Sequence, residues 1–290
     1  MTELVTSYFE PDWCDLIWTD WIELKSRSKE RAIIPREQGV YRVRAEGYDG
    51  LIYVGQTNEL KRRTGALARH TDKIEMPWND PHTAAPNLWA WKDDKNWKYE
   101  VSIATTKLSR QNRMALECLL LWSYRLEKGE STLCNHGRFH PDYIKSSDKS
   151  ANRRGRKLGK KEDRNSSWGP SYPPLTPWKS YLSENWMKLA WNEFQLISEQ
   201  QDVPSKSGIY KIINTKTQEL QYIGESKNLN NRLFNHKQRF PRAQFSYIET
   251  TSSIPKYQRL EIENDLIGHY YEQNRLAPRN QFLRGTGKER

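Results

Sequence analysis

The stretches Gly39-Val40-Tyr41 and Tyr53-Val54-Gly55 decide how this chain is interpreted, because both recur later in it. They return as Gly208-Ile209-Tyr210 and Tyr222-Ile223-Gly224, each 169 positions further along. Other residues keep the same offset: Pro35 and Pro204, Leu60 and Leu229, Arg63 and Arg232. A constant offset over this many positions predicts an internal duplication.

The repeat continues after a change of register. Residues 113–117 match residues 259–263 at an offset of 146, so the first copy carries 23 extra residues. These extra residues lie between Arg63 and Arg113, in a stretch rich in Trp and Pro. Further on, Asn135 is matched with Asn280 at an offset of 145.

Each copy is expected to follow the order β-β-α-β-α. Alternating apolar residues with glycine-containing or polar turns predict hairpins over 39–56 and 208–226, and third strands over 98–106 and 244–251. Asn58 and Asn228 are predicted to cap the helices that follow the hairpins. Apolar periodicity predicts long helices over 109–128 and 254–274.

The same pattern predicts the domain organisation. Trp-rich segments at 15–30 and 180–200 are expected to be helices that cover the adjacent module. The expected fold is α+β, with two modules of a small antiparallel sheet flanked by helices. The first module is assigned to 1–144 and the second to 179–290. Between them, 145–178 is predicted to be a linker, first basic and then rich in Pro and Ser.

Charge is concentrated between the copies. The chain has a net charge of +11, of which residues 145–164 contribute +6, with 9 basic and 3 acidic residues. A local basic surplus suits a polyanion, and a solvated tether is the equally simple alternative. The candidate DNA-binding residues of this segment are Arg153, Arg154, Arg156, Lys157, Lys160 and Lys161.

Two other classes of protein are not favoured. No apolar run reaches the roughly 18 residues of a membrane span. The N-terminus is acidic and lacks the apolar core of a secretory signal, so a cytoplasmic location is expected.

The repeated tripeptides resemble those of the GIY-YIG nucleases. The resemblance covers roughly residues 36–142 and 205–284, and it extends to an Arg ten residues after the second Tyr, a Glu on a later helix and an Asn near the module's end. The implied catalytic residues of the first copy are Tyr41, Tyr53, Arg63, Glu117 and Asn135. Those of the second copy are Tyr210, Tyr222, Arg232, His236, Glu263 and Asn280.

The resemblance also implies their roles. Glu117 and Glu263 would bind Mg²⁺ or Mn²⁺, with phosphate oxygens and water completing the shell. The two arginines would hold the scissile phosphate. The first Tyr of each copy would position or deprotonate a water, provided that nearby cations lower its pKa from about 10. The second Tyr would orient phosphate and water, and the Asn would anchor the metal side of the site.

The copies differ at one position of the family pattern. His236 lies one helical turn after Arg232, whereas the first copy has Leu67 at that position and its nearest histidine is His70. The second copy is therefore the more complete match. Trp side chains between 78 and 97 are expected to be mainly core, with a base-binding pocket as the alternative.

The function expected from this resemblance is metal-dependent hydrolysis of double-stranded DNA, of the restriction or phage-defence type. Two active sites in one chain would allow both strands to be cut by a monomer, and a homodimer stays open. One alternative is a homing or structure-specific nuclease with one catalytic and one recognition module. A second alternative is a DNA-binding protein without activity.

Overall fold

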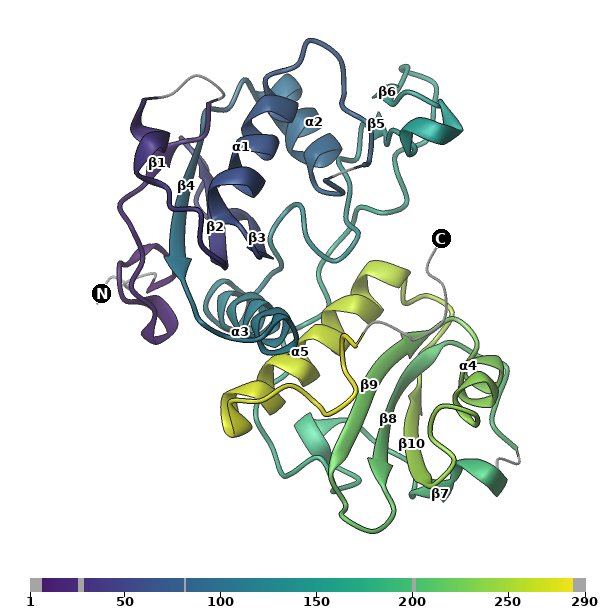
Figure 1. The fold of residues 1–290 in the computed structure, drawn as a ribbon. Helices are drawn as coiled ribbons and strands as arrows, with labels where there is room; N and C mark the ends of the chain where they lie inside the picture. Colours follow the sequence, from purple (N-terminus) through teal and green to yellow (C-terminus); the bar gives the residue numbers. More distant parts are fainter. Residues whose placement is uncertain (1–6, 26–28, 81, 200–201, 284–290) are drawn as a thin grey trace, which may run out of the picture. The chain divides into compact units, whose positions relative to one another are not determined.

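The computed structural model describes residues 7–25, 29–80, 82–199 and 202–283. Within them the chain divides into two compact units. The first unit comprises residues up to 108 together with 123–171, and the second comprises 109–122 together with the residues from 172 onward. Each unit holds its own four-stranded antiparallel sheet with helices beside it (Figure 1). The fold is therefore mixed α+β.

The sheet of the first unit has the order β1-β4-β2-β3. The hairpin consists of β2 (Gly39–Ala45) and β3 (Leu51–Thr57), and β4 (Tyr99–Thr105) pairs with the other edge of β2. The short edge strand β1 (Ile22–Glu23) was not predicted.

The sheet of the second unit has the corresponding order, β7-β10-β8-β9. Its hairpin is β8 (Gly208–Asn214) with β9 (Leu220–Ser226), flanked by β10 (Ala243–Glu249) and the short β7 (Gln195–Leu196). Both hairpins shift register at the same place, after Val43 and after Ile212. The duplication seen in the sequence is thus also a duplication of strand order and register.

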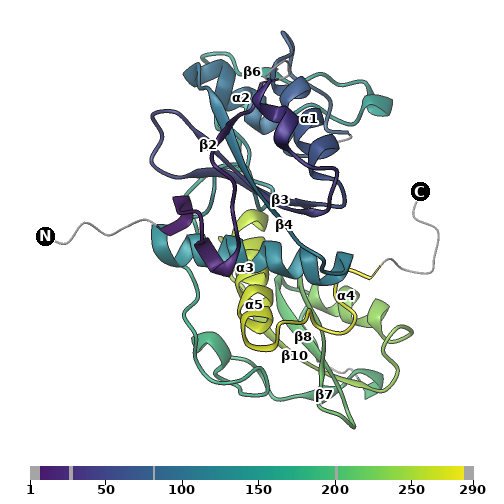
Figure 2. The ribbon, with the colours of Figure 1, turned by 60° about the vertical axis from the view of Figure 1, so that its left-hand side comes forward.

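The α-helices lie beside these sheets. In the first, α1 (Leu60–Thr71) and α2 (Ala85–Lys95) contact each other beside the sheet, as Figure 2 shows. In the second, α4 (Leu229–His236) and α5 (Lys256–Asn274) lie on either side of the sheet. The remaining long helix, α3 (Arg110–Lys128), has residues 110–122 in the second unit. Because of the insertion, α2 has no counterpart in the second unit.

The first part of α3 packs against α5 inside the second unit. A Cβ built at Gly268 of α5 would lie 2.7 Å from the carbonyl oxygen of Cys118, so only a glycine allows this close approach. Asn264 donates a hydrogen bond to the same carbonyl, at 3.2 Å. Sequence reasoning assigned all of 109–128 to the first module, and this packing was not foreseen.

One of the two predicted helix caps is wrong. Asn228 caps α4, since its side chain accepts a hydrogen bond from the backbone N–H of Asn231 at 2.9 Å. In the first copy Glu59, not Asn58, occupies the N-cap position of α1, without a side-chain cap bond. The reason is register, because Glu59 is the residue 169 positions before Asn228.

The Trp-rich segments 15–30 and 180–200 are not α-helical in their described residues, so that prediction is wrong. They form short 3₁₀ turns, Trp13–Asp15 and Trp186–Lys188, followed by extended chain and the edge strands β1 and β7. Two consecutive residues in each turn have positive φ, which an α-helix cannot accommodate.

These segments surround a buried cation in each sheet. Arg42 of β2 lies 4.3 Å from the ring centroid of Trp18 and donates hydrogen bonds to three backbone carbonyls of residues 8–10. Lys211 of β8, which is 169 positions later, lies 4.4 Å from the ring of Trp191 and donates to the carbonyl of Ser183. Both side chains are fully buried. The duplication therefore includes the Trp-rich segments, at a different offset.

A short two-stranded ladder and several 3₁₀ turns are the remaining elements of the described residues. The strands β5 (Tyr143–Ile144) and β6 (Arg156–Lys157) form a two-stranded ladder in the first unit. The other 3₁₀ turns are Ser7–Phe9, Glu30–Ile33, Lys149–Ala151 and Ile197–Glu199. None of the described helices combines the length and apolar character needed to cross a membrane.

Candidate active site

The two motif tyrosines of each copy meet because they lie on neighbouring strands of one hairpin. Tyr210 pairs with Gly224, two residues after Tyr222, and the tyrosine ring centroids are 6.0 Å apart. Tyr41 and Tyr53 repeat this arrangement at 5.9 Å. The glycine is required here, since a Cβ at Gly55 would lie 2.7 Å from the Tyr41 hydroxyl oxygen. The glycine of the motif thus leaves the space that the buried hydroxyl of the first tyrosine occupies.

A histidine contacts the first tyrosine in both units. Nε2 of His236, on α4, lies 2.9 Å from the Tyr210 hydroxyl oxygen. Nε2 of His82, which precedes α2, lies 3.2 Å from the Tyr41 hydroxyl oxygen. His82 belongs to the insertion, and sequence reasoning missed it because only positions near Leu67 and His70 were considered. His70 has no such contact among the interactions described.

Burial keeps both histidines neutral at pH 7. Burial, followed by the charges of Arg232 and Arg239, lowers the pKa of His236 to about 4. Burial, followed by the charges of Arg63 and His70, lowers the pKa of His82 to about 3. A neutral imidazole has one N–H donor and one acceptor, so each histidine exchanges a single hydrogen bond with its tyrosine.

In the second unit the neighbouring arginine does not bring the pKa of the first tyrosine below its usual value. Burial, Tyr222 and Glu263 raise the pKa of Tyr210 well above its usual value, while Arg232 lowers it only in part. Tyr210 also shares a hydrogen bond with the hydroxyl of Tyr222. His236, Tyr210 and Tyr222 therefore form one hydrogen-bonded chain of uncharged groups, which orients protons without carrying charge.

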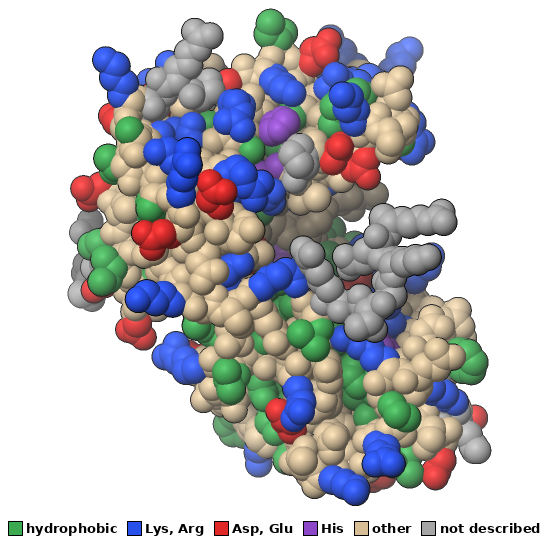
Figure 3. Space-filling view, viewed as in Figure 1, with side chains coloured by type: hydrophobic (Ala, Val, Ile, Leu, Met, Phe, Trp, Pro, Cys, Tyr) green, Lys and Arg blue, Asp and Glu red, His purple; other side chains and the backbone are tan. Residues whose placement is uncertain are grey.

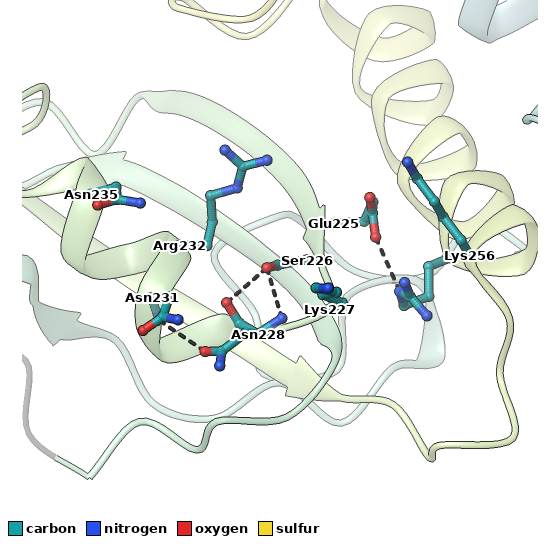
Figure 4. A pocket seen from close by; sticks show the side chains of 9 residues that line it. Glu225, Ser226, Lys227, Asn228, Asn231, Arg232, Asn235 and Lys256 are labelled. Carbon is teal, nitrogen blue, oxygen red and sulfur yellow. Dashed lines mark hydrogen bonds and ion pairs between the residues drawn. The ribbon is translucent and has the colours of Figure 1, made fainter. Parts of the chain in front are cut away.

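The arginines lie on the helix after each hairpin. Arg232 is exposed on α4, one turn before His236, while Arg63 is half-buried on α1. Arg232 borders an open pocket of about 340 Å³ together with Glu225, Lys256 and Arg259 (Figure 4). Four of the side chains around this pocket are cationic, so it suits an anion such as a phosphate.

Glu263 is the acidic residue of the second unit's site. Burial, followed by the charge of Glu225, raises the pKa of its carboxyl group to about 8, although a hydrogen bond from the backbone N–H of Glu225 opposes the shift. Glu225 itself accepts a hydrogen bond from Nε of Arg259 at 3.0 Å. Two acidic groups thus lie close together here, and Glu225 was not among the predicted residues.

Glu117 is half-buried on α3, within the part that belongs to the second unit. The first unit by itself therefore brings together Tyr41, Tyr53, Arg63 and His82, without Glu117. The second unit by itself brings together Tyr210, Tyr222, His236 and Arg232 with Glu263.

The match of Asn135 with Asn280 is wrong by one position. The Asn135 amide forms two hydrogen bonds with the backbone of Val54, accepting from its N–H at 3.0 Å and donating to its C=O at 2.8 Å. In the second unit Gln281 makes the same pair with Ile223, both at 3.0 Å. Asn280 instead donates to Gln221 at 2.6 Å. Gln281 takes the place of Asn135 because its side chain carries the same amide group. Matching identical residue types between the copies cannot detect this substitution.

The predicted DNA-binding segment is structured and partly neutralised. Arg156 pairs with Glu162 through two hydrogen bonds of 2.6 Å, and Lys157 lies 3.2 Å from a carboxylate oxygen of Asp94. Arg154 lies 3.9 Å from the ring centroid of Trp78, and one of its guanidinium nitrogens is 3.5 Å from Glu75. Arg153, Lys160 and Lys161 show no ion pair within the described part of the chain and are the more available cations.

The available side chains limit how many protein ligands a bound metal ion could have. Within the described residues no cluster of three or more His, Cys, Asp or Glu side chains surrounds a common point. A hard divalent cation at Glu263 would therefore take most of its ligands from water and phosphate. The raised pKa of Glu263 fits such a group, because a cation would relieve the unfavourable burial of the carboxylate.

Comparison with protein-family models and with curated proteins finds no match to this chain.

Proposed function

We propose that this protein is a metal-dependent DNA endonuclease whose second unit contains a complete active site. The observation that carries the proposal is the pairing of a buried histidine with the first motif tyrosine in both units. The chain supplies that histidine from α4 in one unit and from an insertion in the other. Packing alone would not explain why an imidazole from two different segments contacts the same tyrosine hydroxyl. A shared role in the reaction would explain it.

The pocket beside α4 is suited to holding a phosphodiester. Arg232 is exposed there and can present its fork of N–H groups to phosphate oxygens, with Lys256 adding charge at the start of α5. The buried Tyr210 hydroxyl, fixed by His236 and Tyr222, would orient the attacking water by hydrogen bonding. Proton abstraction by the same hydroxyl is the alternative role, and it would require nearby cations to lower the pKa of Tyr210.

Glu263 would hold the cation, Mg²⁺ or Mn²⁺, and Glu117 is proposed for the same role in the first site. When bound, the cation supplies charge stabilisation for the phosphate and the leaving oxygen. Gln281 would keep the β9 backbone between Tyr222 and Gly224 in place, since it holds both polar groups of Ile223.

The proposed substrate is double-stranded DNA. The net charge of +11 favours a polyanion, and Lys and Arg side chains are more prominent than Asp and Glu on the face in Figure 3. Two sites in one chain suit the cutting of both strands, as in restriction or phage defence.

A nuclease with one catalytic and one recognition unit is the second candidate. It is favoured by the difference between Gln56 and Glu225 at matching positions, because only the second unit has a carboxylate there.

The test is incubation of supercoiled plasmid with the full chain, in Mg²⁺ and in EDTA. We expect linear product in Mg²⁺ and no cutting in EDTA or in the double variant Glu117→Gln, Glu263→Gln. Glu272→Gln is the matched control, because Glu272 is an exposed residue of α5. Unchanged plasmid with the wild-type chain in Mg²⁺ and in Mn²⁺ would refute the proposal, and cutting that survives EDTA would refute its metal dependence.

A further inference from the structure

An aromatic pocket of about 640 Å³ lies in the first unit, and none of the residues assigned to catalysis lines it. Trp91 and Trp97 on one side come from the insertion that the second copy lacks. Trp168 comes from the segment that sequence reasoning treated as a linker, and Tyr48 comes from the turn between β2 and β3. The pocket is therefore a feature of one copy only and not part of the duplicated core.

The rings form a connected set of flat surfaces. Trp91 and Trp97 are stacked, with centroids 5.6 Å apart and planes 16° apart. Trp168 lies 5.2 Å from Trp91, and Tyr48 lies 5.2 Å from Trp97. Trp97, Trp168 and Tyr48 are only half-buried, so parts of three rings face the solvent. Aromatic surface left open at a pocket rim is available to stack on a planar ligand.

The charges around the pocket indicate which kind of ligand would bind to these rings. Arg138 lies 4.8 Å from the ring centroid of Trp168. Lys95 and Glu130 also line the pocket, and the ammonium group of Lys95 lies 2.9 Å from a carboxylate oxygen of Asp94. A cationic ligand such as a quaternary ammonium would meet the like charge of Arg138, which already occupies an aromatic face. A neutral ring that carries an anionic group has the complementary charge.

Polar residues in the pocket wall could form hydrogen bonds with the edge of such a ring. Trp91 is 7% exposed, and its Nε1–H has no hydrogen-bond partner within the described residues. The hydroxyl of Ser131 and the peptide groups of 169–171 also line the wall. A buried donor without a partner is costly, and the Trp91 ring would have to shift for a ligand acceptor to reach this nitrogen, because it has almost no solvent-accessible surface.

We propose that this pocket binds a nucleotide whose base is unstacked, with the ring against Trp97 and Trp168 and the phosphate near Arg138 and Lys95. Nucleobases combine a planar ring, edge acceptors and an adjacent negative charge, which are the features that this wall complements. The choice of DNA as the source of the nucleotide rests on the proposed function. A free nucleotide has the same ring and phosphate and would fit the same pocket.

The experiment measures binding in EDTA, so that no strand is cut. The probes are a short duplex with one unpaired thymidine, the fully paired duplex, and the mononucleotide dTMP. We expect the full chain to bind the bulged duplex roughly 5- to 100-fold more tightly than the paired one. Trp97→Ala and Trp168→Ala should each remove most of that preference.

Two further variants keep the test independent of misfolding. Trp168→Phe retains a ring face and should keep the preference. Trp178→Ala is the matched control, since Trp178 is exposed and lies outside the pocket. Loss of preference in Trp178→Ala, or its persistence in both pocket alanine variants, would overturn the proposal.

The remaining outcomes separate the alternatives. Equal binding of bulged and paired duplex by the wild type overturns the DNA source, and dTMP binding that depends on Trp97 would then assign the pocket to free nucleotides. Displacement of the probe by tetramethylammonium at low concentration overturns the nucleotide assignment. Plasmid cutting is scored separately, so a protein that prefers the bulged duplex but never cuts would support the pocket and refute the nuclease.

Discussion

The two units reach the same Tyr–His contact by different routes, and this difference separates what is duplicated from what is required. In the second unit His236 lies on α4, one turn after Arg232, as the sequence pattern predicts. In the first unit Leu67 fills that position inside the core, and His82 reaches Tyr41 from the insertion. The backbone of the two units is thus duplicated, while the histidine comes from a different position in each.

Other pairs of positions show the same principle with different substitutes. Asn135 and Gln281 hold the same backbone groups from positions that an identity match misaligns. Arg42 and Lys211 fill the same aromatic enclosure with different cations. The pair Gln56 and Glu225 differs in charge, and Glu225 raises the pKa of Glu263. The units are therefore equivalent in framework and distinct in electrostatics.

The largest expected effect distinguishes two active sites from one. If each site cuts one strand, Glu117→Gln and Glu263→Gln should each convert a double-strand cutter into a nickase, with the affected site slowed by about 1,000-fold. Time courses of supercoiled, nicked and linear plasmid measure this. One inert variant beside one with wild-type behaviour would mean a single catalytic unit. With His82 in place, the Leu67 substitution no longer predicts a slower first site.

The histidines should matter equally in both units if their contacts serve the reaction. We expect His82→Phe to slow cutting at the first site, and His236→Phe at the second, by about 100-fold each. Each variant is assayed in a background where the other site carries its Glu→Gln change. His70→Phe is the control. If His70→Phe has the larger effect, the assignment of His82 is wrong.

The buried cations should respond differently to pH. Burial lowers the pKa of Lys211 to about 7, whereas Arg42, with a pKa of about 10, stays charged. Between pH 7 and the unfolded lysine pKa of about 10.4, unfolding requires Lys211 to take up a proton, so its contribution to stability rises with pH. The free energy of unfolding of wild type minus that of Lys211→Met should rise by about 2 kcal/mol from pH 7 to pH 9.

Taking the difference from Lys211→Met removes the contribution of the cysteines, which titrate in this range in the unfolded state of both proteins. Urea unfolding at the two pH values gives the quantity directly. Lys211→Arg should remove the pH dependence as well, because arginine stays protonated. A difference that is constant with pH would mean that Lys211 stays charged in the folded protein.

The different contacts of Gln281 and Asn280 predict that the two side chains contribute unequally to stability. Gln281→Leu leaves the N–H and C=O of Ile223 without their partners and should destabilise the protein by about 1–3 kcal/mol. Asn280→Leu should cost less, since its side chain pairs with Gln221 near the surface. Urea midpoints of both variants measure this, and the reverse order would restore the original match.

The smallest expected effect concerns the basic segment. Changing Arg153, Lys160 and Lys161 to Gln should lower the log–log salt slope of DNA binding by about 0.9 for each phosphate that the segment no longer neutralises. Arg156→Gln should change the slope less, because Arg156 is already paired with Glu162. Fluorescence anisotropy over a salt series gives both slopes. If the triple variant keeps the wild-type slope, the segment does not contact DNA.

The sequence by itself determined the local framework. The hairpins, the third strands, the helices α3 and α5 and the Tyr–Tyr contacts follow from period-two and period-3.6 patterns and from glycine positions, which act over a few residues. Arg232, His236 and Glu263 were also named in advance, as positions that the resemblance to the GIY-YIG nucleases implies.

Only the tertiary structure decided which distant groups meet. His82 reaches Tyr41 across 41 positions, Gln281 reaches Ile223 across 58, and the Trp-rich segments close over Arg42 and Lys211 as turns and edge strands. The first part of α3 likewise joins the second unit, through Cys118 and Gly268. Such contacts depend on packing and on hydrogen bonds between segments that share no sequence period. For that reason the chain's local pattern specifies the strands and helices, while the chemistry of each site is completed by the fold.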